Sequence, residues 1–205
     1  METPNFVPVN TVGKILDIEY TVTENDLPEA LTTYKRACKR LLNPPIWQLL
    51  SANLSAEFLL FTNGNNYAER LMQEGDFLRI DIPGPGSKAG DGYDWVRVET
   101  IQDNVDKEAD ESIGITVRSA ENPGKPGAGT AHFFKEGASS TFIIKRTGNT
   151  INACYYGRNE LPNTQNISII DKLRNGLVAA GALAGISNLQ WSALLKGLLA
   201  VEIGE

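Results

Sequence analysis

The sequence predicts an α+β fold in which an antiparallel sheet of about six or seven strands packs on a long C-terminal helix. Three observations lead to this prediction. Short segments rich in branched and aromatic residues follow one another from Phe77 to Tyr156 without a helical pattern between them. A capped amphipathic helix follows Asp26, and 21 residues without a charge lie between Arg174 and Lys196. Strands joined without helical crossovers pair antiparallel.

The chain of 205 residues is long enough for one large domain, which buries roughly 70% of its unfolded surface. Residues 1–11 contain two prolines and are expected to form an N-terminal leader. The segment Val12 to Val22 is extended in character and predicts the first strand. We therefore predict a single α+β domain over residues 12–205.

The helix after Asp26 is the best-defined element of the sequence. Asp26 provides a capping side chain, Pro28 suits the first turn, and Glu29 stands at the capping-box spacing. Apolar residues then recur on one face until Asn43, Pro44 and Pro45 end the helix. Residues 46–54 predict a second, short helix.

The middle of the chain predicts strands separated by turns. A short helix is expected at 67–74, ended by Gly75, and Thr147-Gly148-Asn149 is typical of a hairpin. The predicted strands are Glu57–Thr62, Phe77–Ile82, Tyr93–Gln102, Ser112–Arg118, Thr141–Arg146 and Thr150–Tyr156. Alternation within them, as at Leu78, Ile80 and Ile82, indicates that one face of the sheet is apolar.

The uncharged stretch Asn175–Leu195 lies in a helical region that runs from about residue 168 to 203. Its length approaches that of a membrane span, but Asn188 and Gln190 interrupt it, which favours a helix buried in a protein core. Insertion into a membrane stays open as the less favoured alternative. Apolar residues occur nearly all round this helix, as expected where it is held on more than one side.

Composition and motifs exclude several classes of function. The net charge of -6 argues against a protein that coats nucleic acid. The only histidine, His132, and two distant cysteines, Cys38 and Cys154, supply no zinc-ligand spacing and no catalytic triad. We expect no metal and no cofactor, and the absence of a signal-peptide pattern at the N-terminus predicts a cytoplasmic location.

The order strand, helix, short helix, antiparallel strands and terminal helix resembles the helix-grip arrangement of the START-like superfamily. Trp47 after the Pro44-Pro45 break and the apolar terminal helix carry the resemblance. It implies that a curved sheet wraps the terminal helix around a cavity for a hydrophobic ligand. The wall residues that it implies are Trp95, Ile115, Ile143, Leu183, Ile186 and Trp191. Apolar patterning alone also allows the same residues to close into a dry core.

The leading functional hypothesis is a noncatalytic carrier or sensor of a lipid-like or aromatic small molecule. An alternative is an interaction or assembly protein, either self-associating or bound to a partner, whose terminal helix presents Gly176, Gly181 and Gly185 to a close neighbour. An enzyme that uses carboxylates is the least favoured alternative, but it is hard to dismiss because paired acids leave no local signature. Its unranked candidate residues are Glu57, Glu99 and Glu160.

Overall fold

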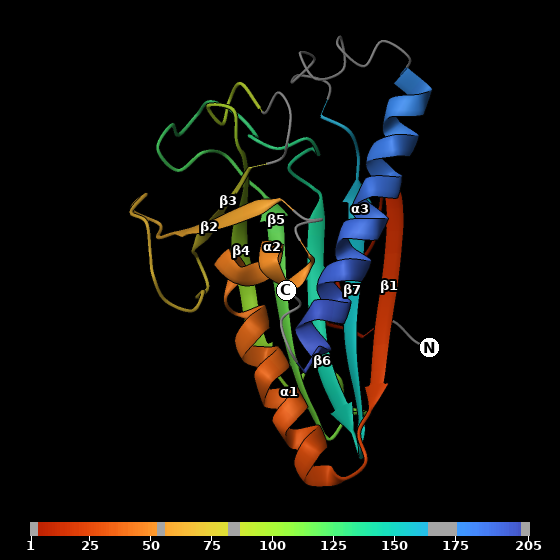
Figure 1. Cartoon of the computed structure of the whole chain (residues 1–205). Coiled ribbons are helices and arrows are strands. Elements are labelled where there is room, and N and C mark those ends of the chain that lie inside the picture. Colours follow the sequence, from red (N-terminus) through yellow and green to blue (C-terminus); the bar gives the residue numbers. More distant parts are fainter. Residues whose placement is uncertain (1–3, 53–55, 82–86, 164–175, 202–205) are drawn as a thin grey trace.

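The computed structural model describes residues 4–52, 56–81, 87–163 and 176–201, and for residues 176–187 it describes the backbone alone. One antiparallel sheet of seven strands dominates the chain, with the order β1-β7-β6-β5-β4-β3-β2 (Figure 1). This result confirms the predicted fold class. The strands are β1 (Lys14–Thr23), β2 (Glu57–Phe61), β3 (Phe77–Asp81), β4 (Asp94–Asp103), β5 (Glu111–Ser119), β6 (Ser139–Thr147) and β7 (Thr150–Glu160).

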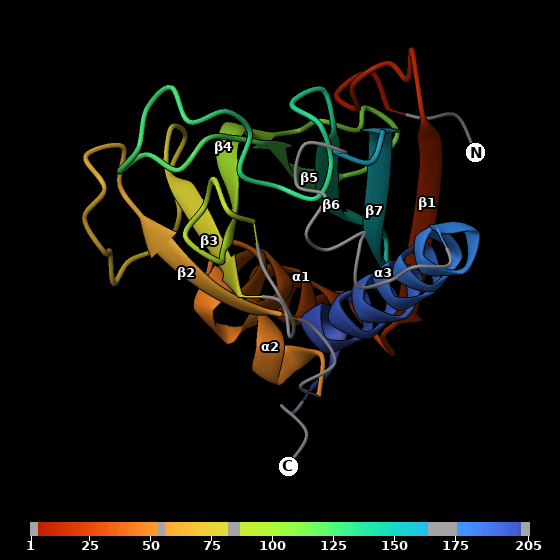
Figure 2. The ribbon, with the colours of Figure 1, turned by 90° about the horizontal axis from the view of Figure 1, so that it is seen from above.

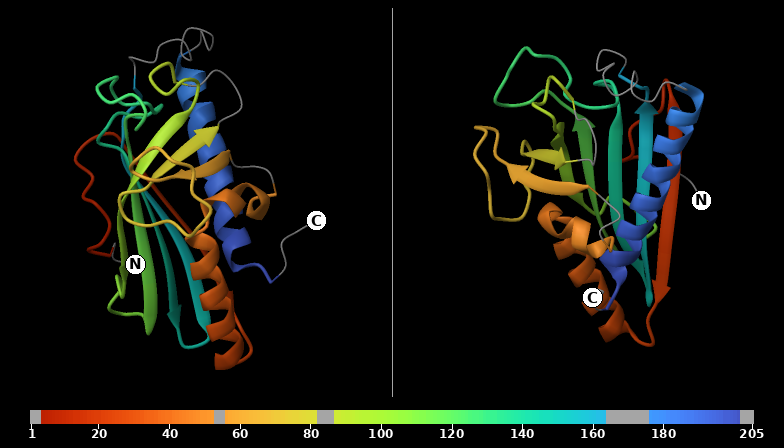
Figure 3. Two further views of the ribbon diagram at one scale, coloured as in Figure 1. Left: turned by 90° about the vertical axis from the view of Figure 1, so that its left-hand side faces the viewer. Right: turned by 45° about the horizontal axis from the view of Figure 1, so that its top comes forward.

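The helices lie together on one side of the sheet, which is curved around them (Figures 2 and 3). They are α1 (Leu27–Leu41), the 3-10 turn η1 (Pro44–Ile46), α2 (Trp47–Leu50) and α3 (Gly176–Leu199). We call the side of the sheet that faces these helices the concave face and the other side the outer face. We call the end where β5 and β7 finish, at the top of Figure 1, the upper end.

The predicted caps and turns of the first helix and of the last hairpin are present. Asp26 Oδ1 accepts a hydrogen bond from Glu29 N at 2.9 Å, and Glu29 Oε2 accepts one from Asn25 Nδ2 at 3.0 Å. The first bond satisfies a backbone donor that a helix N-terminus leaves without a partner. The hairpin turn lies between Thr147 and Thr150, where Gly148 has a φ of 57°. Glycine adopts this left-handed conformation without strain.

The core lies between the concave face and the helices. Ile115 and Ile144 from the sheet, Trp47 from α2 and Leu194 and Leu198 from α3 are all buried there. Alternation along each strand produces this core, because every second side chain points to the same face. The apolar stretch at the end of the sequence is therefore packed against the sheet over its C-terminal half.

The predicted helix at residues 67–74 is wrong. Residue 67 forms an isolated bridge with Phe61, Ala68 N donates to Leu60 O, and Met72 N donates to Leu42 O. These backbone groups find partners on a strand edge and on the end of α1, so a local helix is not needed to satisfy them. Tertiary contacts here override a weak local preference.

Other boundaries also differ from the predicted ones. The second helix is limited to η1 and α2, and the end predicted for it at residues 53–54 lies outside the described residues. The terminal helix is described from residue 176 to 199, while its predicted ends at 168–175 and 202–203 lie outside the described residues. Strand β7 continues four residues past its predicted end at Tyr156 and reaches Glu160.

The predicted leader is packed onto the outer face rather than standing apart. Val7 is buried against Ile143 and Cys154, and Asn159 holds the following residues by accepting hydrogen bonds from Thr11 N at 2.8 Å and Val12 N at 3.2 Å. Asn159 itself has a φ of 57°, a conformation that asparagine tolerates better than most residues. Residues 7–12 thus contact strands β6 and β7 of the sheet.

A buried arginine joins α1 to the end of α3. The Arg40 side chain, which is 8% exposed, donates from Nη1 to Gly197 O at 3.0 Å, Leu198 O at 3.3 Å and Ala200 O at 2.5 Å. These carbonyls belong to the last turn of a helix and lack partners within it. A cation at this end also interacts favourably with the helix dipole. Arg40 therefore anchors the C-terminal end of α3 to α1.

We expect the substitution Arg40→Met to lower the free energy of unfolding by about 2–3 kcal/mol, because it keeps the apolar stem and removes charge-assisted hydrogen bonds to buried carbonyls. Urea denaturation followed by circular dichroism measures the change. The matched control is Lys39→Met on the exposed side of the same helix, which should stay within about 0.5 kcal/mol. Equal effects of the two substitutions would contradict the anchoring role of Arg40.

Candidate functional site

The concave face becomes polar at the upper end of the sheet. Asp94 stands opposite Ile80 in the register of β3 and β4, and Ser119 stands opposite Val96, so both share the face of core residues. Residues directly opposite each other on antiparallel strands project to the same side. The group that we call the polar end comprises Asp94, Ser119, His132, Ser140, Tyr155 and Glu160.

Asp94 is the most unusual member of the polar end. It is 3% exposed and accepts a hydrogen bond from Phe133 N at 3.3 Å. Burial raises the pKa of its carboxyl group to about 7, and the Phe133 amide opposes this shift. Burial has this direction because it disfavours the charged form of an acid. Asp94 therefore changes its charge near neutral pH.

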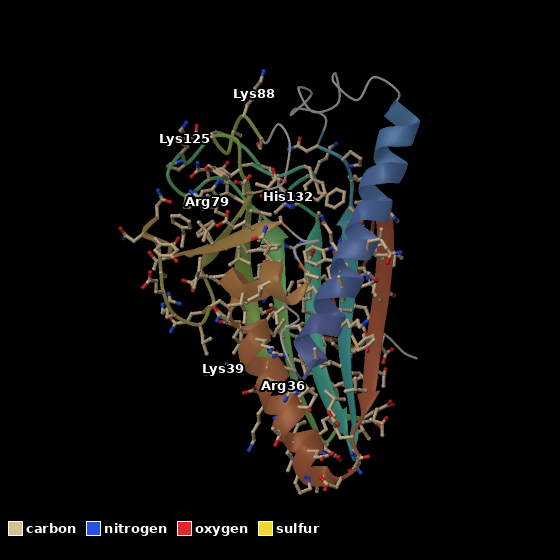
Figure 4. All side chains as sticks on the ribbon, in the orientation of Figure 1. Arg36, Lys39, Arg79, Lys88, Lys125 and His132 are labelled. Atoms are coloured by element: carbon tan, nitrogen blue, oxygen red, sulfur yellow. The ribbon has the colours of Figure 1, made fainter. Side chains whose placement is uncertain are left out.

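His132 lies in the segment that connects β5 and β6, near the upper end of the sheet (Figure 4), next to Phe133, whose amide donates to Asp94. Its Nδ1 accepts a hydrogen bond from Phe134 N at 3.0 Å and lies 3.1 Å from Ser119 Oγ. An Nδ1 that accepts from an amide leaves the proton on Nε2, which defines the neutral tautomer. Burial lowers the pKa of His132 to about 3, while its contact with Phe134 acts in the opposite direction. The imidazole is therefore uncharged at neutral pH.

Strands β6 and β7 supply the other half of the polar end. Tyr155 OH lies 3.0 Å from Ser140 Oγ and donates to Glu160 Oε1 at 3.4 Å. Burial raises the pKa of Glu160, and Lys14 and the Tyr155 hydroxyl act in the opposite direction. A Cβ atom on Gly157 would lie 2.3 Å from Glu160 Oε1, so glycine leaves the room that this carboxylate occupies.

Aromatic rings lie directly below the polar end. Tyr155 stacks on Trp191 of α3 with ring centroids 5.0 Å apart, and Phe142 meets both rings at 5.1 and 5.3 Å. Trp47 and Phe58 extend the cluster, with their ring centroids 5.1 Å apart. Such pairs stabilise the fold beyond what the burial of their area contributes. We call this cluster of rings, from the concave face, α2 and α3, the aromatic floor: Tyr155, Phe142, Phe58, Trp47 and Trp191.

The six predicted wall residues do not all lie on this face. Ile115 belongs to the core, directly opposite Phe142 in the register of β5 and β6, and Trp191 is part of the aromatic floor. Leu183 and Ile186 lie in α3, but their side chains are outside the described part of the chain. Of these residues, Ile115 thus lies on the concave face, and Trp191 packs against the same core from α3.

Trp95 and Ile143 require a correction, because they lie on the outer face. Ile143 packs with Val7 and Cys154. The rings of Trp95 and Phe61 lie with their centroids 5.3 Å apart. Both residues directly neighbour core-facing positions in sequence, and a shift of one residue along a strand reverses the face. Neither residue can line a space beneath α3.

The three glycines proposed for assembly, Gly176, Gly181 and Gly185, are helical, but what surrounds them lies outside the described side chains. Assembly through them stays a prediction. Over the part of the chain that the structure describes, no helix is long and apolar enough to cross a membrane. Within the same ranges, no group of three or more His, Cys, Asp or Glu side chains is placed to hold a metal ion.

The candidate carboxylates lie in different places. Glu57 is exposed on β2, and Glu99 pairs with Arg118 at 2.7 Å near the surface. Glu160 is the one of the three that belongs to the polar end. Asp94 was missed, although its position two residues before Val96 and four before Val98 places an acid on an apolar alternation. An acid at a position where the alternation predicts a core residue is the signal that could have identified Asp94.

Comparison with known proteins supports the fold. No family model matches the sequence, and no curated protein matches it. A solved structure of a hypothetical protein from Helicobacter pylori is similar over 95% of this chain and 97% of that one, with a TM-score of 0.51 and 10% identity.

Two further solved structures show weaker similarity. Norcoclaurine synthase from Thalictrum flavum has a TM-score of 0.40 at 14% identity, with 92% of this chain and 88% of that one covered. Ara h 8.0201 has a TM-score of 0.30 at 10% identity over 88% of this chain and 99% of that one. The seven-stranded antiparallel sheet folded around a C-terminal helix is a helix-grip fold.

Proposed function

We propose that this protein binds a small molecule with an aromatic or lipid-like body and a polar group, between the concave face and α3. The body of the ligand would lie on the aromatic floor, and its polar group would meet the polar end. The observation that carries the proposal is the change of chemistry along one face of the sheet. The same face is apolar in its lower part and carries buried, titratable side chains in its upper part.

Energetics favour this proposal over a core that is merely filled. A buried polar group without full hydrogen bonding costs free energy, and a buried charge costs more. Asp94, His132 and Glu160 are all less than 10% exposed and occupy the same end of the sheet as two serines and a tyrosine. Apolar residues at these positions would stabilise the fold better. Retaining several such groups on one face is typical of a binding site, in which a few polar groups orient a ligand.

The proposal predicts that the protein binds a neutral aromatic dye and that added bulk at the polar end prevents binding. The test is a fluorescence titration with N-phenyl-1-naphthylamine, comparing the wild type with Ser140→Phe. Phenylalanine at position 140 would project from the concave face beside Tyr155 and occupy the ligand's place. We expect the affinity to fall at least about 10-fold, the loss that a steric conflict of about 1.4 kcal/mol produces.

The matched control is Thr100→Phe, which adds the same ring at an exposed position on β4. It should bind the dye as the wild type does. Native mass spectrometry of the purified wild type complements the titration, since an adduct of a few hundred daltons that is lost on denaturation would identify a natural ligand. Absence of dye binding by the folded wild type, or equal binding by the Ser140→Phe variant, would refute a ligand site at the polar end.

A further inference from the structure

Asp94 differs from two other acids of this chain, Asp76 and Asp106, in the partners that its carboxylate has. Asp76, which is 4% exposed, binds Arg70 through both carboxylate oxygens at 2.7 and 2.8 Å and also accepts from Gln73 N at 2.7 Å. Asp106 pairs with Lys145 at 2.8 Å. Asp94 is buried as deeply as Asp76, but among the described residues its hydrogen bonding is limited to the Phe133 amide.

The neighbours of Asp94 do not supply the missing positive charge. His132, the residue before Phe133 in the segment between β5 and β6, is neutral because its Nδ1 accepts from the Phe134 amide. Ser119 is an uncharged neighbour on the next strand. The other acid of the polar end, Glu160, has the positive charge of Lys14 nearby, whereas no described cation acts on Asp94. Within the described residues, the ionised form of Asp94 thus has no counter-ion.

The two acids also stand at opposite sides of the face. Asp94 lies on β4 and Glu160 on β7, three strand spacings apart in the sheet order. At about 4.8 Å per spacing, the strands that carry them are roughly 14 Å apart along the sheet. The aromatic floor lies on this same face, so a ligand on the floor can reach Asp94 with a group at one end. A carboxylate that is buried and lacks a partner is best compensated by a cation.

On the basis of the proposed function, we infer that the ligand carries a protonated amine and that Asp94 binds this amine. The amine completes an ion pair that the protein's own described residues leave open, much as Arg70 does for Asp76. The aromatic floor binds the apolar remainder of the molecule. The ligand class is thus an amphipathic amine, with an aromatic or lipid-like body and one cationic end.

Three probes of one shape test this inference by isothermal titration calorimetry at pH 8. They are 4-phenylbutylamine, 4-phenylbutan-1-ol and 4-phenylbutanoate, which share a body and differ in the charge of the end group. At this pH Asp94 is largely ionised, because its pKa is about 7. We expect the amine to bind about 10- to 100-fold more tightly than the alcohol, and the carboxylate to bind most weakly, as charge-assisted pairing predicts.

The variant Asp94→Asn separates charge from structure. Asparagine keeps an oxygen that can accept from Phe133 N, so the loop that carries His132 retains its anchor. We expect the affinity of this variant for the amine to fall about 10-fold or more while its affinity for the alcohol changes less than about 3-fold. The control Glu99→Gln removes the same charge from a surface ion pair and should leave all three affinities unchanged.

The outcomes distinguish the inference from the proposed function on which it rests. If the wild type binds the alcohol as tightly as the amine, or if Asp94→Asn keeps the preference for the amine, the inference is overturned and the ligand site stands. If the folded wild type binds none of the probes and also fails to bind the neutral dye, the ligand site itself is refuted. Circular dichroism of each variant confirms that the fold is retained.

Discussion

We expect the substitution Gly197→Ala to destabilise the protein by about 3 kcal/mol, although alanine is the better helix former by about 1 kcal/mol. Gly197 lies in the last turn of α3, where the helix crosses α2 at its closest approach. A Cβ atom there would lie 1.9 Å from Leu50 O and 2.6 Å from Leu50 C. These are backbone atoms, so a rotamer change cannot relieve the clash. One of the two helices must move instead.

This movement has further consequences at the junction of the three helices. Arg40 bonds to the carbonyls of residues 197, 198 and 200, and Leu194 and Leu198 are fully buried beside Trp47. A displaced α3 weakens these hydrogen bonds and opens space in a closely packed core. The expected decrease in the free energy of unfolding therefore exceeds what the local clash alone would cause. For this reason we place it near the upper end of the usual range for overpacking.

Urea denaturation of the wild type and the Gly197→Ala variant measures the effect. The matched control is Gly137→Ala, because Gly137 lies at an exposed turn where no heavy atom is within 4 Å of an added Cβ. The control should change the free energy of unfolding by less than about 0.5 kcal/mol. An unchanged or increased stability of Gly197→Ala would show that α2 and α3 do not meet as described.

The second large effect concerns pH. We expect Asp94→Asn to stabilise the protein at pH 8 by roughly 2–4 kcal/mol and to have little effect near pH 4. The folded-state pKa of Asp94 is raised by burial to about 7, above the value of about 3.9 for an unfolded aspartate. The folded state thus holds the proton more tightly. The stability contributed by Asp94 is fully present below pH 4 and is lost as the pH rises through 7, whereas asparagine carries no charge at any pH.

His132 contributes with the opposite sign. Its folded-state pKa, lowered by burial to about 3, lies below the value of about 6.5 for an unfolded histidine. Its contribution is present above pH 6.5 and is lost as the pH falls toward 3. Between about pH 4 and 6.5 the two slopes oppose each other in the wild type. In the Asp94→Asn variant the histidine contribution is no longer offset, so stability should rise with pH over this range.

Thermal and urea denaturation at pH 4, 6 and 8 tests both statements with one pair of proteins. The difference in free energy of unfolding between variant and wild type should increase steadily with pH. The control Glu99→Gln, at an exposed ion pair, should show no such increase. A difference that is constant with pH would mean that Asp94 has the same pKa in the folded and unfolded states, and would contradict the shift that burial causes.

Local patterns in the sequence account for most of the elements. Capping residues around Asp26 and Pro28 define the start of α1, and Gly148 marks the hairpin between β6 and β7, because these features act through hydrogen bonds and dihedral preferences of neighbouring residues. The period of two predicts the strands, since it depends only on the pleat. The predicted helix at residues 67–74 is wrong, because the backbone groups there find their partners on β2 and at the end of α1.

The sequence by itself thus determined the fold class, the order of the elements and an apolar terminal helix for the sheet to enclose. The tertiary structure alone decided which strand residues meet that helix, since Trp95 and Ile143 project from the outer face while Asp94 joins the core side. It also placed Arg40 at the end of α3 and gathered the polar end from four strands and a loop. The reason is that register and strand pairing bring together residues more than 60 positions apart, such as Asp94 and Glu160, and no local pattern encodes these juxtapositions.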